Sequence, residues 1–325
     1  MSRLTEPTLA VPVVQVSDLS LAYGPTPLVR HVSFEVAAGE IVGLVGPNGA
    51  GKTSIVESVA GLRQATTGGT IRVCGIDPLE DRARMSSLVG IQLQESAFPS
   101  RARVGELCDL YERLYSRPGA TRKLLKDFGL DDRRRSFITS LSGGMKQRLA
   151  LVLAQVGDVR LVILDELTTG LDPEQRRSTW KMVRDLAGTG VAVLLTSHNM
   201  DEVETLCSRV GVLLAGSLKA YGSPIELVTQ YGGGTRFSVD LRGQPSTASD
   251  SAISFGFELG EGERPGFYCF YGQLPEDYNR ILSWMTDLGL GSQLVTFKSQ
   301  NFEDAYLQLV GRTGSSQMKI ERKSV

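Results

Sequence analysis

The residues whose chemistry is easiest to infer form the stretch from Gly46 to Thr53, which fits the phosphate-cradling pattern G-x-x-x-x-G-K-[ST]. Glycines let backbone N–H groups turn toward phosphate oxygens, because no Cβ crowds the ligand. Lys52 is expected to reach the β- and γ-phosphates, and the Thr53 hydroxyl to ligate Mg²⁺. The stretch therefore predicts a nucleoside triphosphate site, a P-loop. Its predicted ligand-binding residues are Gly46, Pro47, Asn48, Gly49, Ala50, Gly51, Lys52, Thr53 and Ser54.

Two polar clusters follow apolar runs of strand length further along the chain. Asp165-Glu166 ends the run that begins at Leu161, and Ser197-His198 ends the run that begins at Val191. In a parallel sheet these strand ends lie beside the P-loop, where ligands bind. Asp165 can orient the shell of a Mg²⁺ ion and Glu166 can polarise an attacking water. A lone histidine is usually structural, but His198 stands where a γ-phosphate sensor would be useful.

Three further positions have both a functional and an ordinary structural interpretation. Ser142-Gly143-Gly144 predicts the N-terminus of a helix over 146–156, which is either a second anion site or a common capped helix. Asp172, before Pro173, is a plausible cap for the next helix. Tyr23 ends a predicted strand over 13–23, where it could stack on an adenine or be an edge-strand tyrosine.

The elements around these residues alternate between strands and helices, which indicates an α/β fold with a parallel sheet and a helical insertion. The predicted strands cover residues 13–23, 32–36, 41–45, 70–73, 88–93, 161–164, 191–196, 210–214 and 218–221. A single helix is predicted from Val104 to about Asp127, since its apolar residues follow a helical period.

At Gly232-Gly233-Gly234 the pattern changes to that of a small α+β unit. The chain is predicted to divide into a nucleotide-binding domain over 1–231, with a helical subdomain at about 95–157, and a C-terminal domain over 235–311. The polar tail over 312–325 is expected to be disordered. The strands predicted in the C-terminal domain cover 237–241, 254–259, 267–271 and 294–297, and the helices cover 276–288 and 302–309.

Composition limits the classes of function. The 325 residues include 41% hydrophobic residues, enough for two cores. A net charge of −1 gives no basic excess for nucleic acid or an anionic membrane surface. Four cysteines without C-x-x-C spacing are expected to be reduced thiols in a cytosolic protein. We expect neither a signal peptide nor a membrane span, since no apolar run approaches the roughly 20 residues that a span needs.

Taken together, the P-loop, Leu141–Met145, Leu161–Glu166, Gly170–Asp172 and His198 resemble the ATP-binding subunit of ABC transporters over about residues 13–230. The closest resemblance is to antibiotic-exporter ATPases of the daunorubicin-resistance type. The residues that carry this second resemblance are Gln92-Leu93-Gln94-Glu95-Ser96 and the segment from Phe302 to Arg312.

The resemblance implies a role for each matching residue. Tyr23 would stack on adenine, Gln94 would link the γ-phosphate and Mg²⁺ to a membrane partner, and Gln92 is the alternative for that role. Glu166 would be the general base and His198 the switch histidine. In addition, Ser142, Gly143 and Gly144 would bind the γ-phosphate of the opposite protomer's ATP, and Asp172 would make a cross-dimer contact.

Three positions depart from the family pattern. Met145 stands where glutamine is commonest and Leu167 where proline commonly follows the glutamate, and neither change touches the expected phosphate contacts. Arg101–Val104 replaces a Leu-Thr-Val pattern, which puts inferences about the partner-facing surface in doubt.

The resemblance implies a homodimer that sandwiches two ATP molecules and an integral membrane permease that holds it at the cytoplasmic side of the cell membrane. The expected activity is Mg²⁺-dependent ATP hydrolysis that drives export of a drug, antibiotic or lipid-like substrate. The alternatives are an importer ATPase, a non-transport ATPase acting on nucleic acid or ribosomes, and a regulatory module that binds ATP without turnover. No nucleic-acid partner is expected, because the chain has neither a basic excess nor a long coiled-coil insertion.

Overall fold

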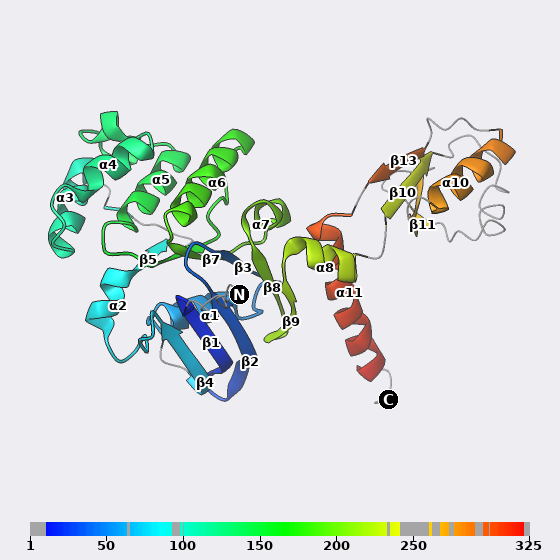
Figure 1. Ribbon diagram of the computed structural model, residues 1–325, viewed down its shortest axis with the longest axis horizontal. Coiled ribbons are helices and arrows are strands. Elements are labelled where there is room, and N and C mark those ends of the chain that lie inside the picture. Colours follow the sequence, from blue (N-terminus) through cyan, green and yellow to red (C-terminus); the bar gives the residue numbers. More distant parts are fainter. Residues whose placement is uncertain are drawn as a thin grey trace, which may run out of the picture. The chain divides into compact units, whose positions relative to one another are not determined.

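The chain divides into two compact units, Met1–Pro224 and Ile225–Val325 (Figure 1). The boundary therefore comes earlier than the predicted 231. The computed structural model describes residues 11–63, 66–92, 98–99, 101–232, 235–240, 260–261, 267–272, 276–289, 295–298 and 300–321.

A six-stranded sheet forms the centre of the first unit, in the order β5-β6-β7-β3-β8-β9. All neighbours are parallel except the β8–β9 hairpin. Every residue of β3, β6 and β7 is buried, as expected for parallel strands covered on both faces. The strands are β3 Ile41–Val45, β5 Val89–Gln92, β6 Leu161–Asp165, β7 Ala192–Thr196, β8 Arg209–Leu214 and β9 Ser217–Gly222.

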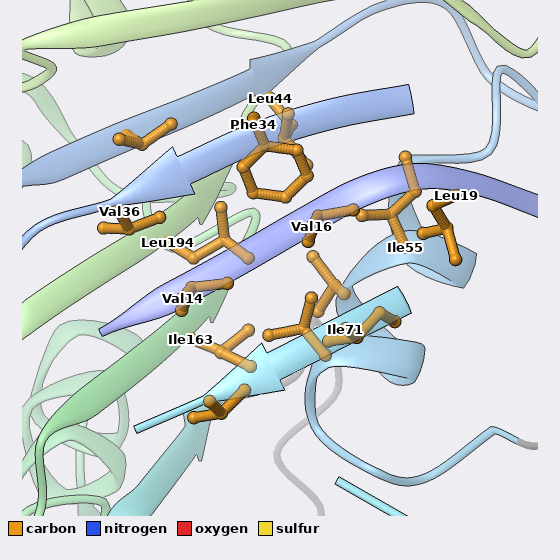
Figure 2. Packing of buried hydrophobic residues seen from close by; sticks show 14 of the residues in the cluster. Val14, Val16, Leu19, Phe34, Val36, Leu44, Ile55, Ile71, Ile163 and Leu194 are labelled. Atoms are coloured by element: carbon orange, nitrogen blue, oxygen red, sulfur yellow. The ribbon is translucent and has the colours of Figure 1, made fainter. Parts of the chain in front are cut away.

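A second, antiparallel sheet has the order β2-β1-β4, from β1 Val14–Tyr23, β2 Thr26–Val36 and β4 Thr66–Val73. Its inward side chains share one core with helix α1, Lys52–Val59, and with the central sheet (Figure 2). Burying each such side chain contributes roughly 1.5–3 kcal/mol. This core fixes α1, and hence the loop before it, against both sheets.

Strand β2 is longer than the predicted 32–36 and includes Pro27. Proline lacks the N–H that a central strand would donate, so it is tolerated at an edge. Because β2 is the edge strand of its sheet, Pro27 does not stop it.

The predicted single helix over 104–127 is wrong, since the chain forms α3, Val104–Leu114, and α4, Ala120–Asp127. Ser116 and Gly119 between them have φ values of 52° and 80°, which a helix cannot contain. The Glu112 carboxylate accepts hydrogen bonds from the backbone N–H groups of Gly119, at 2.7 Å, and Thr121, at 3.0 Å. A side chain from the last turn of α3 thus accepts hydrogen bonds from the N–H groups at the start of α4.

The other helices of the first unit are α2 Arg82–Leu88, α5 Gly143–Leu153, α6 Pro173–Gly188 and α7 Met200–Leu206, with short 3₁₀ turns at Asp131–Arg133 and Ile138–Ser140. Helices α5 and α6 lie on one side of the central sheet, and α1 with the antiparallel sheet lies on the other (Figure 1).

The second unit contains a four-stranded antiparallel sheet in the order β11-β12-β10-β13. Phe237, Ile281 and Trp284 are fully buried within the unit. The predicted strand over 254–259 lies outside the described residues. The elements are α8 Pro224–Tyr231, β10 Thr235–Asp240, β11 Gly260–Glu261, β12 Phe267–Gly272, α10 Glu276–Asp287, β13 Val295–Lys298 and α11 Phe302–Glu321.

Helix α11 extends to Glu321, into the tail over 312–325 that is predicted to be disordered, and that prediction stays untested. Among the described residues, no helix is long and apolar enough to cross a membrane.

An ion pair joins the start of β8 to the turn before β3. Arg209 donates to both oxygens of the Glu40 carboxylate, from Nε at 2.5 Å and Nη2 at 2.6 Å. Burial raises the pKa of Glu40, but the Arg209 hydrogen bonds and the Ala37 N–H outweigh burial and hold the pKa below its usual 4.5. The pair therefore stabilises the folded state with a defined pH dependence.

Replacing Glu40 by glutamine is expected to lower the free energy of unfolding of the first unit by about 1–2 kcal/mol at pH 7. Because the folded-state pKa is depressed, the stabilisation is present above pH 4.5 and disappears as the pH falls through that folded pKa. The measurement is urea unfolding at neutral and acidic pH, followed by Trp180 fluorescence in a Trp284→Phe background, which leaves one tryptophan.

The matched control is Glu80→Gln, since the Glu80 side chain is 76% exposed and lies 3.8 Å from Arg72. This variant should stay within about 0.5 kcal/mol of wild type. If Glu40→Gln lowers the free energy of unfolding by the same amount at both pH values, the ion-pair explanation is contradicted.

Candidate functional site

The P-loop connects β3 to α1 through glycines that no other residue could replace without strain. Gly51 has φ 105°, and a Cβ there would lie 2.6 Å from Val29 Cγ2. Gly51 is also the N-cap residue of α1 and provides no side-chain cap to its N–H groups. Those donors are therefore available to an anion at the N-terminus of the helix.

A cavity of about 700 Å³ opens at this point. It brings the P-loop together with the residues that follow β6 and β7, because the parallel strands end at one edge of the sheet. The lining residues are Leu28, Asn48, Gly49, Gly51, Lys52, Thr53, Ser54, Asp165, Glu166 and His198.

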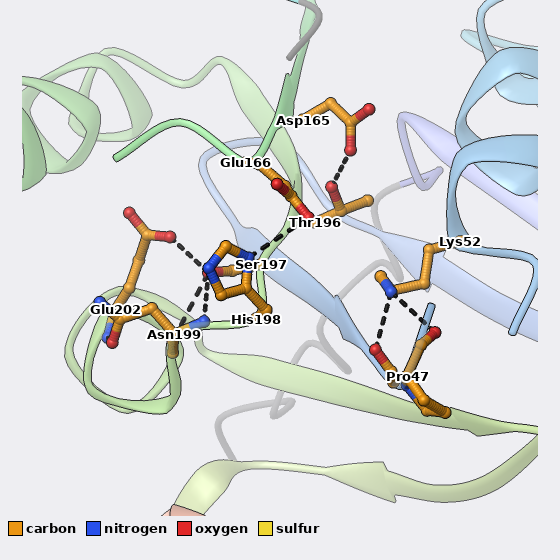
Figure 3. A network of polar contacts seen from close by, with 10 residues as sticks. Pro47, Lys52, Asp165, Glu166, Thr196, Ser197, His198, Asn199 and Glu202 are labelled. Carbon is orange, nitrogen blue, oxygen red and sulfur yellow. Dashed lines mark hydrogen bonds and ion pairs between the residues drawn. The ribbon is translucent and has the colours of Figure 1, made fainter. Parts of the chain in front are cut away.

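Lys52 is the cation of this cavity, and its side chain is buried. Its ammonium group donates hydrogen bonds to the carbonyl oxygens of Gly46, at 2.7 Å, and Pro47, at 3.1 Å (Figure 3). Burial lowers the pKa of Lys52, and the carboxylates of Glu166 and Asp165 oppose that shift. The ammonium group is thus held inside the loop and balanced by two nearby negative charges.

Asp165 and Glu166 are adjacent but differently held. The buried Asp165 carboxylate accepts a hydrogen bond from the hydroxyl of Thr196, its register partner on β7. Glu166 has φ 52°, an uncommon conformation for a residue with a side chain, and its N–H donates to the Thr196 carbonyl at 3.0 Å. Its Oε1 lies 3.3 Å from His198 Nδ1 (Figure 3). Backbone strain of this kind recurs at functional sites.

Magnesium ions prefer oxygen ligands and usually take only one or two from the protein. Thr53 and Asp165 offer a hydroxyl and a carboxylate oxygen to the same cavity. Within the described ranges, no group of three or more His, Cys, Asp or Glu side chains could form a protein-only metal site. The donor set therefore fits an ion that completes its shell with phosphate oxygens and water.

Tyr23 does not line the cavity and is 75% exposed. It is linked to the site through Arg63, whose guanidinium lies 5.7 Å from the Tyr23 ring centroid and donates to the Ser54 hydroxyl at 2.8 Å. Sequence reasoning missed Arg63, because only the fold brings the end of β1 and the end of α1 together.

Ser142, Gly143, Gly144 and Asp172 also lie outside this cavity. Ser142 caps α5 by accepting a hydrogen bond from the Met145 N–H at 3.3 Å, and Asp172 caps α6. Both capping predictions agree with the structure, whereas the phosphate roles of these residues require a nucleotide other than one held by this chain's own P-loop.

Gln94 lies outside the described residues. Gln92, the alternative, ends β5 opposite Leu164 and is buried. Its Oε1 has no hydrogen-bond partner among the described residues, and the side chain does not line the cavity. The described geometry therefore gives Gln92 no contact with the predicted site.

The chain matches the family model described as ABC transporter over residues 29–169, which run from β2 to the segment after Glu166. A second model, described as an AAA domain, matches residues 137–204. The two matches together span every cavity residue except Leu28.

Two relatives are similar over most of the chain. The Nod factor export ATP-binding protein I of Rhizobium meliloti (strain 1021) is 35% identical over 315 residues, 94% of this chain and 90% of that protein. The linearmycin resistance ATP-binding protein LnrL of Bacillus subtilis (strain 168) is 34% identical over 236 residues, 71% of this chain and 76% of that protein.

Solved structures are similar over the nucleotide-binding part. An ATP-binding subunit of an ABC transporter aligns with a TM-score of 0.62 at 28% identity, covering 68% of this chain and 93% of the other. The ADP conformation of another ATP-binding cassette, at 19% identity, shares the fold with a TM-score of 0.60. The motifs, the sheet order and these similarities agree, and the chain belongs to the ATP-binding subunits of ABC transporters.

Proposed function

We propose that this chain is a Mg²⁺-dependent ATPase that energises export of a drug, antibiotic or lipid-like substrate through a separate membrane permease. The observation that carries the proposal is the cavity in which Lys52 and Thr53 meet Asp165, Glu166 and His198. One cation, two carboxylates and an imidazole around a phosphate-cradling loop can offset phosphate charge and position an attacking water, as phosphoryl transfer to water needs.

In the proposed mechanism, the P-loop N–H groups and Lys52 hold the phosphates and offset the charge that develops on them. Mg²⁺ held by Thr53 and Asp165 would add further compensation of that charge. Glu166 orients the attacking water and accepts its proton, since its carboxylate faces the same cavity. His198, 3.3 Å from Glu166 Oε1, senses the γ-phosphate.

A complete site is proposed to need two chains. Ser142 and Gly143 are exposed at the start of α5 and absent from the lining of the cavity in their own chain. With Gly144 they would bind the γ-phosphate held by a second copy, and Asp172 would contact that copy. Tyr23 would stack on adenine beside the P-loop of its own chain, and Gln94 would connect the site to the permease.

A groove of about 880 Å³ in the first unit is the proposed contact surface for the permease. Leu110 and Leu114 of α3 line it and are 50% and 68% exposed, so a partner seated in the groove would bury their apolar surface. Relatives named for Nod factor export and linearmycin resistance favour export over import. The chain would then work on the cytoplasmic side of the membrane, held there by the permease.

Replacing Glu166 by glutamine is expected to lower ATP turnover at least about 100-fold, because the general base is lost while the phosphate ligands remain. ATP binding should persist, and the variant should form an ATP-dependent dimer on size-exclusion chromatography. Glu174→Gln, which changes an exposed glutamate at the start of α6, is the control and should keep wild-type turnover. Normal ATPase activity in Glu166→Gln would remove Glu166 from the base role.

Replacing Thr53 by alanine is expected to raise the Mg²⁺ concentration needed for half-maximal turnover about tenfold or more, because one oxygen ligand is removed. Wild-type turnover should stop in EDTA and return when Mg²⁺ is added. The control Thr26→Ala removes an exposed hydroxyl from β2 and should leave the Mg²⁺ requirement unchanged. Equal Mg²⁺ curves for wild type and Thr53→Ala would contradict the assigned ligand.

The export proposal is tested by purifying the tagged chain from its native membranes in mild detergent. A protein with several membrane spans should copurify with wild type and with Ile225→Arg, a control that changes an exposed apolar residue of the second unit. It should be lost with Leu114→Arg, which places a charge in the groove. Recovery of ribosomes or nucleic acid without a membrane protein would overturn the transport function.

A further inference from the structure

The loop that carries His198 is held by one buried carboxylate, that of Glu202 in α7. Glu202 is buried, with only 1% of its surface exposed. One of its oxygens accepts a hydrogen bond from the Ser197 hydroxyl at 2.6 Å (Figure 3), and the other accepts one from the Trp180 indole N–H at 3.0 Å. Both carboxylate oxygens therefore have a donor partner.

The hydrogen bonds around His198 form a closed circuit. The Asn199 N–H donates to the Ser197 hydroxyl at 3.0 Å, and the Asn199 side-chain oxygen accepts from the Glu202 N–H at 3.2 Å. The residues immediately before and after His198 are thus both tied to Glu202. The backbone of the loop has little freedom to move without breaking several of these bonds.

The His198 side chain itself is much less enclosed. It is 59% exposed, and its Nδ1 lies 3.3 Å from Glu166 Oε1. The backbone of the loop places the His198 Cβ and limits which rotamers the ring can adopt. The buried circuit is therefore well placed to determine where the imidazole points.

Trp180 extends the circuit to a second element. It lies on α6, is 9% exposed, and contacts Glu202 on the neighbouring helix. Helix α6 has 16 residues and begins directly after Asp172. The carboxylate therefore anchors the His198 loop to a long helix packed in the first unit and not only to its own short helix.

We propose that Glu202 is a positioning residue for ATP hydrolysis, which fixes the His198 loop against Trp180 so that the imidazole faces Glu166 and the γ-phosphate. This inference rests on the sensor role of His198 in the proposed function. A buried carboxylate is costly unless its oxygens are hydrogen-bonded, whereas a residue needed only to fill space would be apolar. Its two donors, from Ser197 and Trp180, connect the catalytic loop to the helix layer.

The test combines turnover with a direct measurement on the imidazole. Glu202→Leu keeps the side-chain size but removes both acceptors, and Trp180→Phe removes one donor. Both are expected to lower kcat, Glu202→Leu tenfold or more, with the Kd for the non-hydrolysable analogue AMP-PNP within about twofold of wild type. Glu202→Gln retains one acceptor oxygen and should recover most of the turnover.

NMR of the histidine rings separates positioning from general destabilisation. The chain has two histidines, so the second, His31, which pairs with Asp18 at 2.8 Å, serves as an internal reference. In Glu202→Leu and Trp180→Phe, the His198 signals should shift or broaden and respond less to AMP-PNP, while the His31 signals stay in place. Trp284→Phe, a buried tryptophan of the second unit, is the matched control and should change neither.

The proposal is overturned if Trp180→Phe and Glu202→Leu keep wild-type kcat and His198 signals and only lower the melting temperature, as Trp284→Phe does. If Glu202→Leu does not fold, Trp180→Phe alone decides. His198→Ala tests the proposed function separately, because wild-type turnover in that variant would refute the sensor role. The His198 NMR signals of Glu202→Leu and Trp180→Phe would still report whether Glu202 fixes the ring. On a His198→Ala background, Trp180→Phe should cause no additional loss of kcat.

Discussion

The turn at Gly51 is the constraint on which the nucleotide-binding unit depends. The backbone enters α1 there with φ 105°, and the Val29 side chain leaves no room for a Cβ. This turn directs the free N–H groups of the helix toward the cavity and places Lys52 inside the loop. The shared core of the two sheets and α1 holds the turn in position, so apolar packing at a distance determines the geometry of a polar site.

Three buried charged side chains, two in the cavity and one behind His198, each have a hydrogen-bond partner. Lys52 is held by loop carbonyls, Asp165 by the Thr196 hydroxyl, and Glu202 by donors from a strand end and a helix. Because an unpartnered buried charge costs far more than a paired one, these contacts fix side chains that would otherwise be mobile. Glu166 follows β6 in a strained backbone conformation, and its carboxylate lies 3.3 Å from His198 Nδ1.

The single chain separates the groups that such a site needs. The P-loop, both carboxylates and His198 share one cavity, whereas Ser142 and Asp172 cap helices whose starts lie outside it. Each helix start still offers backbone N–H groups to an anion. Ser142, Gly143 and Asp172 thus remain exposed away from this cavity, which is the physical reason to expect that nucleotide binding and association of two chains are linked.

The sequence alone determined the P-loop, the strand ends that carry Asp165, Glu166 and His198, and the helix caps at Ser142 and Asp172, because each depends on local backbone chemistry and short apolar runs. It failed over 104–127, where Ser116 and Gly119 adopt positive φ values and end the helical run, and at β2, whose edge position accepts Pro27. Only the tertiary structure decided that Arg63 lies between Tyr23 and Ser54, and that Glu202 meets Trp180 behind His198. Only the fold brings Tyr23 to Arg63 and Glu202 to Trp180, and burial strengthens the hydrogen bond between Glu202 and Trp180.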